Sequence, residues 1–414
     1  MSKNKLIILI LLILFIGLTP ITAVDNDNKN WTMFQENIQH TGFVDASSNH
    51  ITNTWMYNAE DSINSTPAIK DGVAYVISQK GILRAINIED GSCNWDLDLK
   101  TNVKASPVIK GDILCVGGED GYMYGCNITD KSVEWKFKTS EPIESSAYID
   151  EDSLYFGSNN GHVYKLNIDD GEKIDDYNLG GKIISSPVVV NDSLFVGSTN
   201  NKIYSINVNS GDENWVYTSG DEVVSSPAIV NNTVFIGSCD GEVYALSQND
   251  GSIIWKFDSG NKVLSSPSID EYNNNLYIGS DSGDAYCLDI RDGVLKWTYN
   301  TGGKVESTPA ISNENVVITS DSGKVFILSK YSGQNNLTFN PGSYVFNSPI
   351  TSSPVIYGDS LVVSGGDGYV YSLDIHKIER PFTFYNFCTI LIIFGVLVLL
   401  FAGFKFGVNR GKEN

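Results

Sequence analysis

Histidine, cysteine and positive charge are all scarce in this chain. Only 4 of its 414 residues are histidine and 6 are cysteine, and neither a C-x-x-C pair nor a Cys/His spacing of the kind that binds zinc occurs. No histidine is placed by a recognisable motif beside a serine or cysteine nucleophile. We therefore expect no fold built on disulfides, no metal centre and no catalytic residues.

The shortage of lysine and arginine excludes one class of partner. The chain carries 28 Lys and Arg against 49 Asp and Glu, a net charge of −21. Proteins bind nucleic acid by neutralising its phosphates with positive side chains, so we expect no nucleic-acid partner. An excess of negative charge is typical of an exposed domain that must stay soluble.

A unit of about 40 residues recurs along most of the chain. It is aligned by a proline, or by an alanine in the third copy, at Pro67, Pro107, Ala147, Pro187, Pro227, Pro267, Pro309 and Pro354. Successive positions are 40 residues apart, except for the last two intervals of 42 and 45. A period of this length indicates a propeller or a solenoid.

Each unit predicts four short strands, which is the pattern of one propeller blade. Apolar runs alternate with tight turns such as Asp240-Gly241, a pair suited to a type I′ hairpin. A tryptophan marks the fourth strand of most units, at Trp55, Trp95, Trp135, Trp215, Trp255 and Trp297. Asp175 and Leu337 take the two other slots. Each indole is expected to pack between blades and to donate its N–H to the neighbouring blade.

The eighth unit stops before its fourth strand, and Trp55 supplies the missing slot from the other end of the chain. Closure of this kind leaves no unpaired strand edge. The sequence therefore predicts an all-β fold, an eight-bladed β-propeller over residues 24–379 that the N-terminal strand closes.

The repeats resemble those of the pyrroloquinoline-quinone-like (PQQ-like) propeller family. The resemblance rests on segments such as 85–95 (AINIEDGSCNW) and 288–297 (LDIRDGVLKW), in which a small or apolar residue and Asp or Asn precede a Gly turn and a Trp. The family includes quinone-dependent dehydrogenases and non-enzymatic scaffolds such as the propeller lipoprotein of bacterial outer-membrane assembly. The chain lacks the adjacent cysteines and long insertions of the dehydrogenases, so the resemblance implies a scaffold without a cofactor.

Two apolar segments flank the predicted propeller. Lys3 and Lys5 precede an apolar run that ends near Ala23, which predicts a signal peptide over residues 1–23. Residues 384–404 contain an uncharged run of 18 residues, long enough for a transmembrane helix. Basic residues follow it in the short tail 405–414 and favour a cytoplasmic C-terminus. We expect a single-pass protein of the cell membrane with the propeller outside.

Two kinds of covalent modification are also suggested by the sequence. Cys115 and Cys126 flank the Asp120-Gly121 turn symmetrically and are a candidate disulfide. Acceptor motifs for N-glycosylation occur at Asn30, Asn64, Asn127, Asn191, Asn231 and Asn336.

A binding surface is expected where the innermost strands begin. The residue before each proline slot is always Ser or Thr, and these hydroxyls are expected to bond local backbone, or else to form a polar binding ring. The residue three before the slot varies: Asn64, Lys104, Glu144, Ile184, Val224, Leu264, Glu306 and Thr351. Its neighbour is β-branched in all units and should lie in the core. The variable set should therefore face the channel mouth as a funnel with an apolar and a charged wall.

The expected function is that of a membrane-anchored scaffold which binds a protein or peptide at this mouth. One alternative is a quinoprotein dehydrogenase, which needs Glu, Asn and Asp side chains able to hold calcium beside a quinone. On the predicted rim only Asn64, Glu144 and Glu306 offer such groups. A second alternative is a structural surface-layer or adhesin-like protein.

Overall fold

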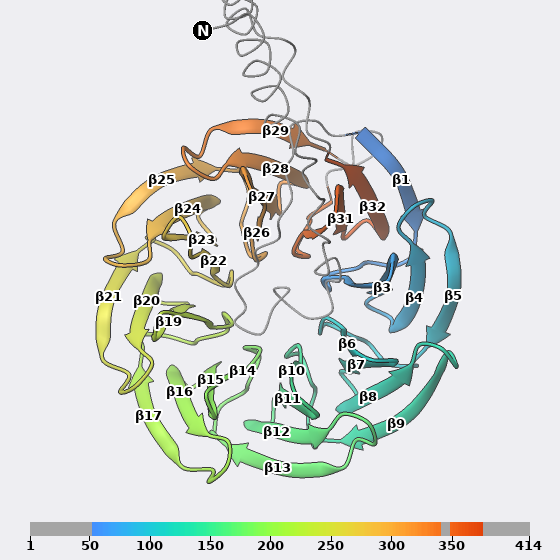
Figure 1. Cartoon of the computed structure of the whole chain (residues 1–414), viewed down its shortest axis with the longest axis horizontal. Coiled ribbons are helices and arrows are strands. Elements are labelled where there is room, and N and C mark those ends of the chain that lie inside the picture. The colour runs from blue at the N-terminus through green and yellow to red at the C-terminus, as the bar shows by residue number, and fades with distance from the viewer. Residues whose placement is uncertain (1–51, 341–347, 376–414) are drawn as a thin grey trace, which may run out of the picture.

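The described chain forms a ring of blades around a central axis (Figure 1). The computed structural model describes residues 52–340 and 348–375, and within them all regular structure is β. There are 32 strands in eight four-stranded sheets. The predicted eight-bladed, all-β propeller is confirmed for this part of the chain.

The blades are numbered along the chain, each from its inner to its outer strand. Blade one is β2 (Ala68–Lys70), β3 (Val73–Ile77), β4 (Ile82–Asn87) and β5 (Cys93–Asp98); blade two is β6 (Val108–Lys110), β7 (Ile113–Gly117), β8 (Tyr122–Asn127) and β9 (Ser132–Lys138). Blade three is β10 (Tyr148–Asp150), β11 (Ser153–Gly157), β12 (His162–Asn167) and β13 (Lys173–Asn178); blade four is β14 (Val188–Val190), β15 (Ser193–Ser198), β16 (Lys202–Asn207) and β17 (Glu213–Thr218). Blade five is β18 (Ala228–Val230), β19 (Thr233–Gly237), β20 (Glu242–Ser247) and β21 (Ile253–Asp258); blade six is β22 (Ser268–Asp270), β23 (Asn275–Gly279), β24 (Asp284–Asp289) and β25 (Leu295–Asn300). Blade seven is β26 (Ala310–Ile311), β27 (Asn315–Ser320), β28 (Lys324–Ser329) and β29 (Asn335–Phe339); blade eight is β30 (Val355–Tyr357), β31 (Ser360–Ser364), β32 (Tyr369–Asp374) and β1 (Thr52–Asn58).

The burial of the strands explains their sequence pattern. The middle strands of a blade, such as β19 and β20, are buried at nearly every position, because another blade covers each of their faces. Outer strands such as β21 are mostly exposed, apart from the tryptophan. Near-continuous apolar runs in the middle strands and mixed runs in the outer strand follow from this difference.

The N-terminal strand completes the last blade, as predicted. β1 pairs antiparallel with β32, with Trp55 opposite Ser372, and Figure 1 shows β1 at the outer edge of that sheet. The Trp55 indole donates a hydrogen bond of 2.5 Å to the Ile88 carbonyl of blade one. The closure therefore joins the first and last blades both by strand pairing and by a side chain.

Five of the six predicted tryptophans are docked as the repeat pattern indicates. Their indole N–H groups donate to a carbonyl of the next blade, and their rings are only 7–8% exposed: Trp55, Trp135, Trp215, Trp255 and Trp297. Each ring lies against a glycine with positive φ in the receiving blade, as Trp215 does against Gly251. A Cβ on Gly251 would be 2.6 Å from that ring.

Trp95 is the exception, because the receiving position holds Lys131 instead of glycine. Lys131 has a φ of 57°, the left-handed conformation that glycine adopts at the docks of the other five tryptophans. Trp95 is only partly buried, and its indole has no acceptor among the described residues. In the slot of Asp175, the nearby Tyr177 takes the docking role, since its hydroxyl donates to the Val208 carbonyl at 2.9 Å.

The predicted disulfide between Cys115 and Cys126 is wrong. Both cysteines are free. The hairpin register pairs Cys115 with Gly125 and Cys126 with Leu114, so the two thiols lie on opposite faces of the sheet. They enter different core clusters, and burial raises the pKa of Cys126 to about 12.

The predicted signal peptide (1–23), transmembrane helix (384–404), tail (405–414) and glycosylation site at Asn30 lie outside the described residues. Within residues 52–340 and 348–375, no helix of the length and apolar character needed to cross a bilayer is present.

Candidate functional site

The channel mouth is formed by two sets of residues that one hydrogen bond per blade holds together. The first mouth set is the predicted one: Asn64, Lys104, Glu144, Ile184, Val224, Leu264, Glu306 and Thr351. The second mouth set follows the second strand of each blade: Gln79, Glu119, Asn159, Thr199, Cys239, Asp281, Asp321 and Gly366. In every blade the backbone N–H of the second set donates, at 2.8–3.0 Å, to the carbonyl two residues before the first set.

The structure places all eight residues of the first mouth set at the surface. Asn64 and Lys104 are exposed and the other six are partly exposed. The adjacent β-branched residues, such as Ile143 and Val223, are at most 3% exposed. In blades two to six a glycine on the second strand accommodates such a residue, as Gly197 does Val223. The predicted core column is therefore confirmed, and it fixes the mouth residues on a rigid support.

Blades two and three form a polar sector whose charged side chains are paired with one another. The Lys104 ammonium lies 3.1 Å from Glu119 and 3.3 Å from Glu144. Asn159 donates a further hydrogen bond of 3.0 Å to Glu144. The hydrogen bond to Glu119, above all, raises the pKa of Lys104. This sector has a net charge of −1, and Asn159 Oδ1 is buried without a hydrogen-bond partner among the described residues.

Blades four to six form an apolar sector. Ile184, Val224 and Leu264 come from consecutive blades, and Thr199 and Cys239 lie behind the first two. Cys239 is only 8% exposed, and burial raises the pKa of its thiol to about 11, so the group is neutral at physiological pH. The three apolar side chains are therefore bordered by charges, since Lys262, Asp221 and Glu222 act on the Cys239 thiol.

Blades six and seven form an acidic sector of three carboxylates, Asp281, Glu306 and Asp321, in which one lysine contacts the first two. The Lys304 ammonium lies 2.8 Å from Asp281 Oδ2 and 3.4 Å from Glu306 Oε1. Burial and the charges of Asp321 and Asp281 raise the pKa of Glu306. Burial also raises the pKa of Asp321, and Asp281 adds to it. Three carboxylates and one ammonium leave a net charge of −2.

The second mouth set was not found from the sequence. Its members follow a Ser or Gly at the end of the second strand, as Asp281 follows Ser280, but they share no residue type that would mark them. The prediction that only Asn64, Glu144 and Glu306 offer oxygen ligands on the rim was therefore incomplete. Glu119, Asn159, Asp281 and Asp321 lie on the same rim. Across the joint of blades eight and one, the Thr351 hydroxyl donates a hydrogen bond of 3.3 Å to Asn64 Oδ1.

Hydroxyls below the mouth link the blades into a ring. The residues before the proline slots accept a hydrogen bond from the backbone N–H of the preceding blade, as Ser226 does from Ser186 at 2.9 Å. The same link joins Thr66, Ser106, Ser146, Ser186, Ser226 and Ser266 in order, and Thr308, Ser353 and Thr66. These hydroxyls therefore bond backbone, as expected, but across blades.

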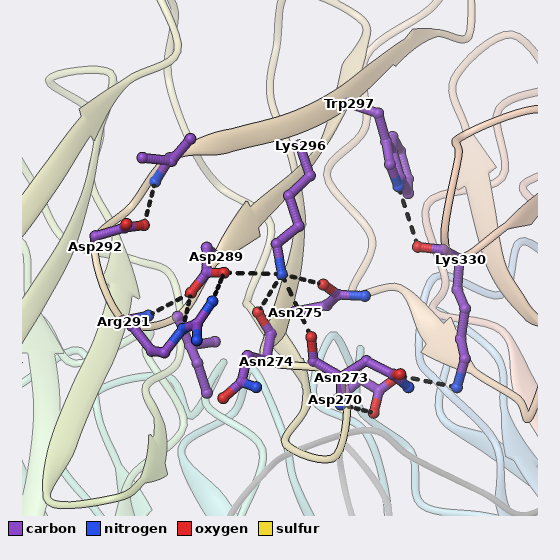
Figure 2. A network of polar contacts seen from close by, with 12 residues as sticks. Asp270, Asn273, Asn274, Asn275, Asp289, Arg291, Asp292, Lys296, Trp297 and Lys330 are labelled. Atoms are coloured by element: carbon purple, nitrogen blue, oxygen red, sulfur yellow. Dashed lines mark hydrogen bonds and ion pairs between the residues drawn. The ribbon is translucent and has the colours of Figure 1, made fainter.

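The ring of links is interrupted between Ser266 and Thr308, at the joint of blades six and seven. Other buried bonds cross this joint within the described residues, including Ser265 Oγ to the Ser307 carbonyl at 2.8 Å. On the opposite face, the Lys330 ammonium lies 2.9 Å from Asp270, and both side chains are at most 4% exposed. Figure 2 shows this pair beside the docked Trp297.

The same close-up shows a second cluster of charges at the base of blade six (Figure 2). Asp289 accepts hydrogen bonds from Arg291 and lies 3.1 Å from the Lys296 ammonium. The Arg291 guanidinium, above all, holds the pKa of Asp289 well below its usual range. Because every charge in this network is paired with another, we interpret it as structural.

The predicted glycosylation sites fall on both faces of the ring. Asn64 is exposed at the mouth, whereas Asn191 and Asn231 lie in exposed turns on the opposite face. Asn127 and Asn336 use their side-chain amides to donate to Glu134 and Asn315. A glycan on Asn64 would cover part of the mouth.

Three comparisons with known proteins place the fold. The sequence model of a family described as "Beta-alanine-activating enzyme, beta-propeller" matches residues 109–375. A search of curated proteins gave no match. Similar solved structures include BamB from Moraxella catarrhalis, with 15% identity, a TM-score of 0.65 and coverage of 78% of this chain and 100% of that one.

Two dehydrogenases are also similar in structure. A europium-containing methanol dehydrogenase has 11% identity and a TM-score of 0.74, with coverage of 84% of this chain and 98% of that one. A quinohemoprotein alcohol dehydrogenase from Comamonas testosteroni has 12% identity and a TM-score of 0.73, with coverage of 87% and 83%. At these identities the likeness concerns the fold alone.

Proposed function

We propose that this chain, which belongs to the family of the beta-alanine-activating enzyme β-propeller and is a propeller of the PQQ-like type, is a membrane-anchored, extracytoplasmic scaffold that binds a protein segment at its channel mouth. The observation that carries the proposal is the apolar sector. Ile184, Val224 and Leu264 come from consecutive blades, and each remains partly exposed at the mouth.

The direction of the chain supports a mouth that faces away from the membrane. β1 begins beside the end of β32, since Thr52 pairs with Asp374. Ile375 donates to the Asp359 carbonyl in the turn between β30 and β31, on the face opposite the mouth. The apolar segment 384–404 follows Ile375 by only a few residues, so an anchor there would leave the mouth open to partners outside the cell.

The mouth is tested by a matched pair of substitutions in the full-length, detergent-solubilised protein. Val224→Asp should abolish capture of the partner from the native membrane and soluble fractions, because it places an unpaired charge in the apolar sector. Val294→Asp is the control, since Val294 is 58% exposed and directly precedes the outer strand β25, at the end of the blade opposite the mouth. Both variants should keep the wild-type melting temperature. If Val224→Asp captured the partner at the wild-type level, the mouth would be ruled out as the binding site.

The membrane part of the proposal needs its own measurement. Alkaline extraction of membranes should leave the full-length protein in the pellet, and protease added to intact cells should remove the propeller. Release by alkali would contradict an anchor, and protection from protease would contradict an extracytoplasmic propeller.

A quinoprotein dehydrogenase is the second candidate, and the acidic sector is the observation that favours it. Asp281, Glu306 and Asp321 could in principle contribute ligands to calcium, which takes 6–8 oxygens. The donor set does not fit, however, because the Lys304 ammonium already contacts two of the three carboxylates. In the described residues no three His, Cys, Asp or Glu side chains are grouped so as to hold a metal ion.

Calorimetric titration of the full-length protein with pyrroloquinoline quinone plus calcium separates the two candidates. The scaffold proposal expects no saturable heat and no rise in melting temperature. Saturable binding with a matching stabilisation would favour the dehydrogenase.

A further inference from the structure

We infer that the segment bound at the mouth carries a lysine or arginine next to a large apolar residue, with the apolar residue on the apolar sector and the positive charge in the acidic sector. This inference rests on the proposed function and specifies the chemistry of the partner. It is carried by the way in which the two sectors adjoin.

The two sectors meet within blade six. Leu264 ends the apolar sector, and Asp281 begins the acidic one. The Asp281 backbone N–H donates to the Lys262 carbonyl at 2.9 Å, two residues before Leu264. A ligand that lies on Leu264 therefore reaches the first carboxylate with its neighbouring residue. An apolar ligand without a cation would place no positive charge next to the Asp281 carboxylate.

Asp281 has unused hydrogen-bonding capacity. Its side chain is nine-tenths buried, and Oδ2 is paired with Lys304. Its other oxygen, Oδ1, is buried and has no hydrogen-bond partner among the described residues. Buried acceptors are nearly always satisfied, and of the two unpartnered oxygens in the second mouth set, Asp281 Oδ1 and Asn159 Oδ1, only the first belongs to a charged group.

The polar sector of blades two and three offers a comparison on the same rim, although Asn159 Oδ1 there is also buried without a partner among the described residues. There, one ammonium serves two carboxylates, and Asn159 supplies an additional donor. The acidic sector has one more carboxylate and no comparable amide. A second cation would bring its charge from −2 to −1, the value of the polar sector, and relieve the repulsion between Glu306 and Asp321.

A divalent metal ion is a poorer match for this sector than a basic side chain. The carboxylates surround an ammonium and are not grouped around a common point in the described chain. A guanidinium or ammonium on a flexible stem can approach from the open side and bond one or two carboxylates.

The experiment is a selection of random 12-residue peptides, displayed on phage, against the full-length protein. Peptides whose capture is lost on Val224→Asp are sequenced, and the best are synthesised with their Lys or Arg intact or replaced by Gln. Affinities are then measured for the wild type, for Glu306→Gln with Asp321→Asn, and for Glu306→Lys. The control is Glu119→Gln, which removes one carboxylate charge from the polar sector.

We expect mouth-dependent peptides to be enriched in Lys or Arg within two residues of Leu, Ile, Val or Phe. Loss of the two carboxylates should weaken binding about fivefold or more, whereas Glu119→Gln should change it less than about twofold. Glu306→Lys should reverse the preference towards acidic peptides.

Mouth-dependent peptides without enrichment of Lys or Arg would overturn this inference and leave the proposed function intact. Peptides that bind equally to Val224→Asp, or the absence of any bound peptide, would count against the proposed function as well.

Discussion

Lys131→Gly should stabilise the propeller by restoring the one missing tryptophan dock. Five indoles lie on a positive-φ glycine of the next blade, and the corresponding position for Trp95 is Lys131. Removing this side chain gives Trp95 the space that Trp215 has over Gly251. The indole could then sink to the 7–8% exposure of the docked rings and donate to the next blade.

The gain can be worked out from the contacts involved. Burying about 50 Å² more of the indole contributes about 1.2 kcal/mol at about 25 cal/mol per Å². The new hydrogen bond contributes about 1 kcal/mol. Relief of a left-handed lysine adds about 1 kcal/mol, and the extra backbone freedom of glycine in the unfolded chain takes back about the same amount. The unfolding free energy should therefore rise by about 2 kcal/mol.

Guanidinium unfolding of the wild type, Lys131→Gly, Trp95→Phe and the double variant measures this gain as a double-mutant cycle. The stabilisation should largely disappear in the Trp95→Phe background, because phenylalanine is smaller and has no N–H. An equal gain in both backgrounds would show that it comes from the backbone of residue 131 alone, and the docking explanation would be wrong. Gly251→Lys is the converse test and should destabilise, since a Cβ there is 2.6 Å from Trp215.

Two further predictions concern the hydroxyl links and the acidic sector. Ser226→Ala should lower the unfolding free energy by about 1–3 kcal/mol, because it leaves the buried Ser186 N–H without its acceptor; Thr308→Val, at the interrupted link, should cost less than about 0.5 kcal/mol, and equal losses would contradict the role of the links. Glu306 has a raised pKa, so its ionisation opposes folding, and its contribution to stability falls as the pH rises above its ordinary value of about 4.3. Denaturation at several pH values should therefore show that the unfolding free energy of Glu306→Gln rises relative to that of the wild type between about pH 4 and about pH 7. A difference in unfolding free energy that does not change with pH would contradict this.

The ring could be predicted from the sequence because its determinants repeat. A β-branched residue, a hydroxyl and a tryptophan recur in register, and each has the same surroundings in almost every blade. Whether the Trp95 indole docks on the next blade could not be predicted from its own position in the repeat, since docking depends on Lys131 in the next unit. The disulfide failed for a similar reason: the two cysteines are symmetric about the turn, but the register is offset by one residue.

The first mouth set could be predicted and the second could not, for a physical reason. The first set is marked by the constant β-branched core residue beside it. The second set lies where no core contact constrains the residue type, and only a backbone hydrogen bond joins it to the first. Backbone bonds leave no signature in side chains. As a result, Asp281 and Asp321, which make the sector acidic, were visible only in the structure.

Several departures from the repeat meet at the joint of blades six and seven. The turn between β22 and β23 of blade six is two residues longer than the turn between β18 and β19 of blade five, and the hydroxyl link between Ser266 and Thr308 is interrupted. The acidic sector lies on one face of this joint and the buried pair of Asp270 and Lys330 on the other. A ring built from equal units needs no such asymmetry for its stability, and buried ion pairs are costly unless fully bonded. The repeat architecture therefore does not explain these features of the joint. Its mouth face is where we place the recognition of a basic, apolar partner.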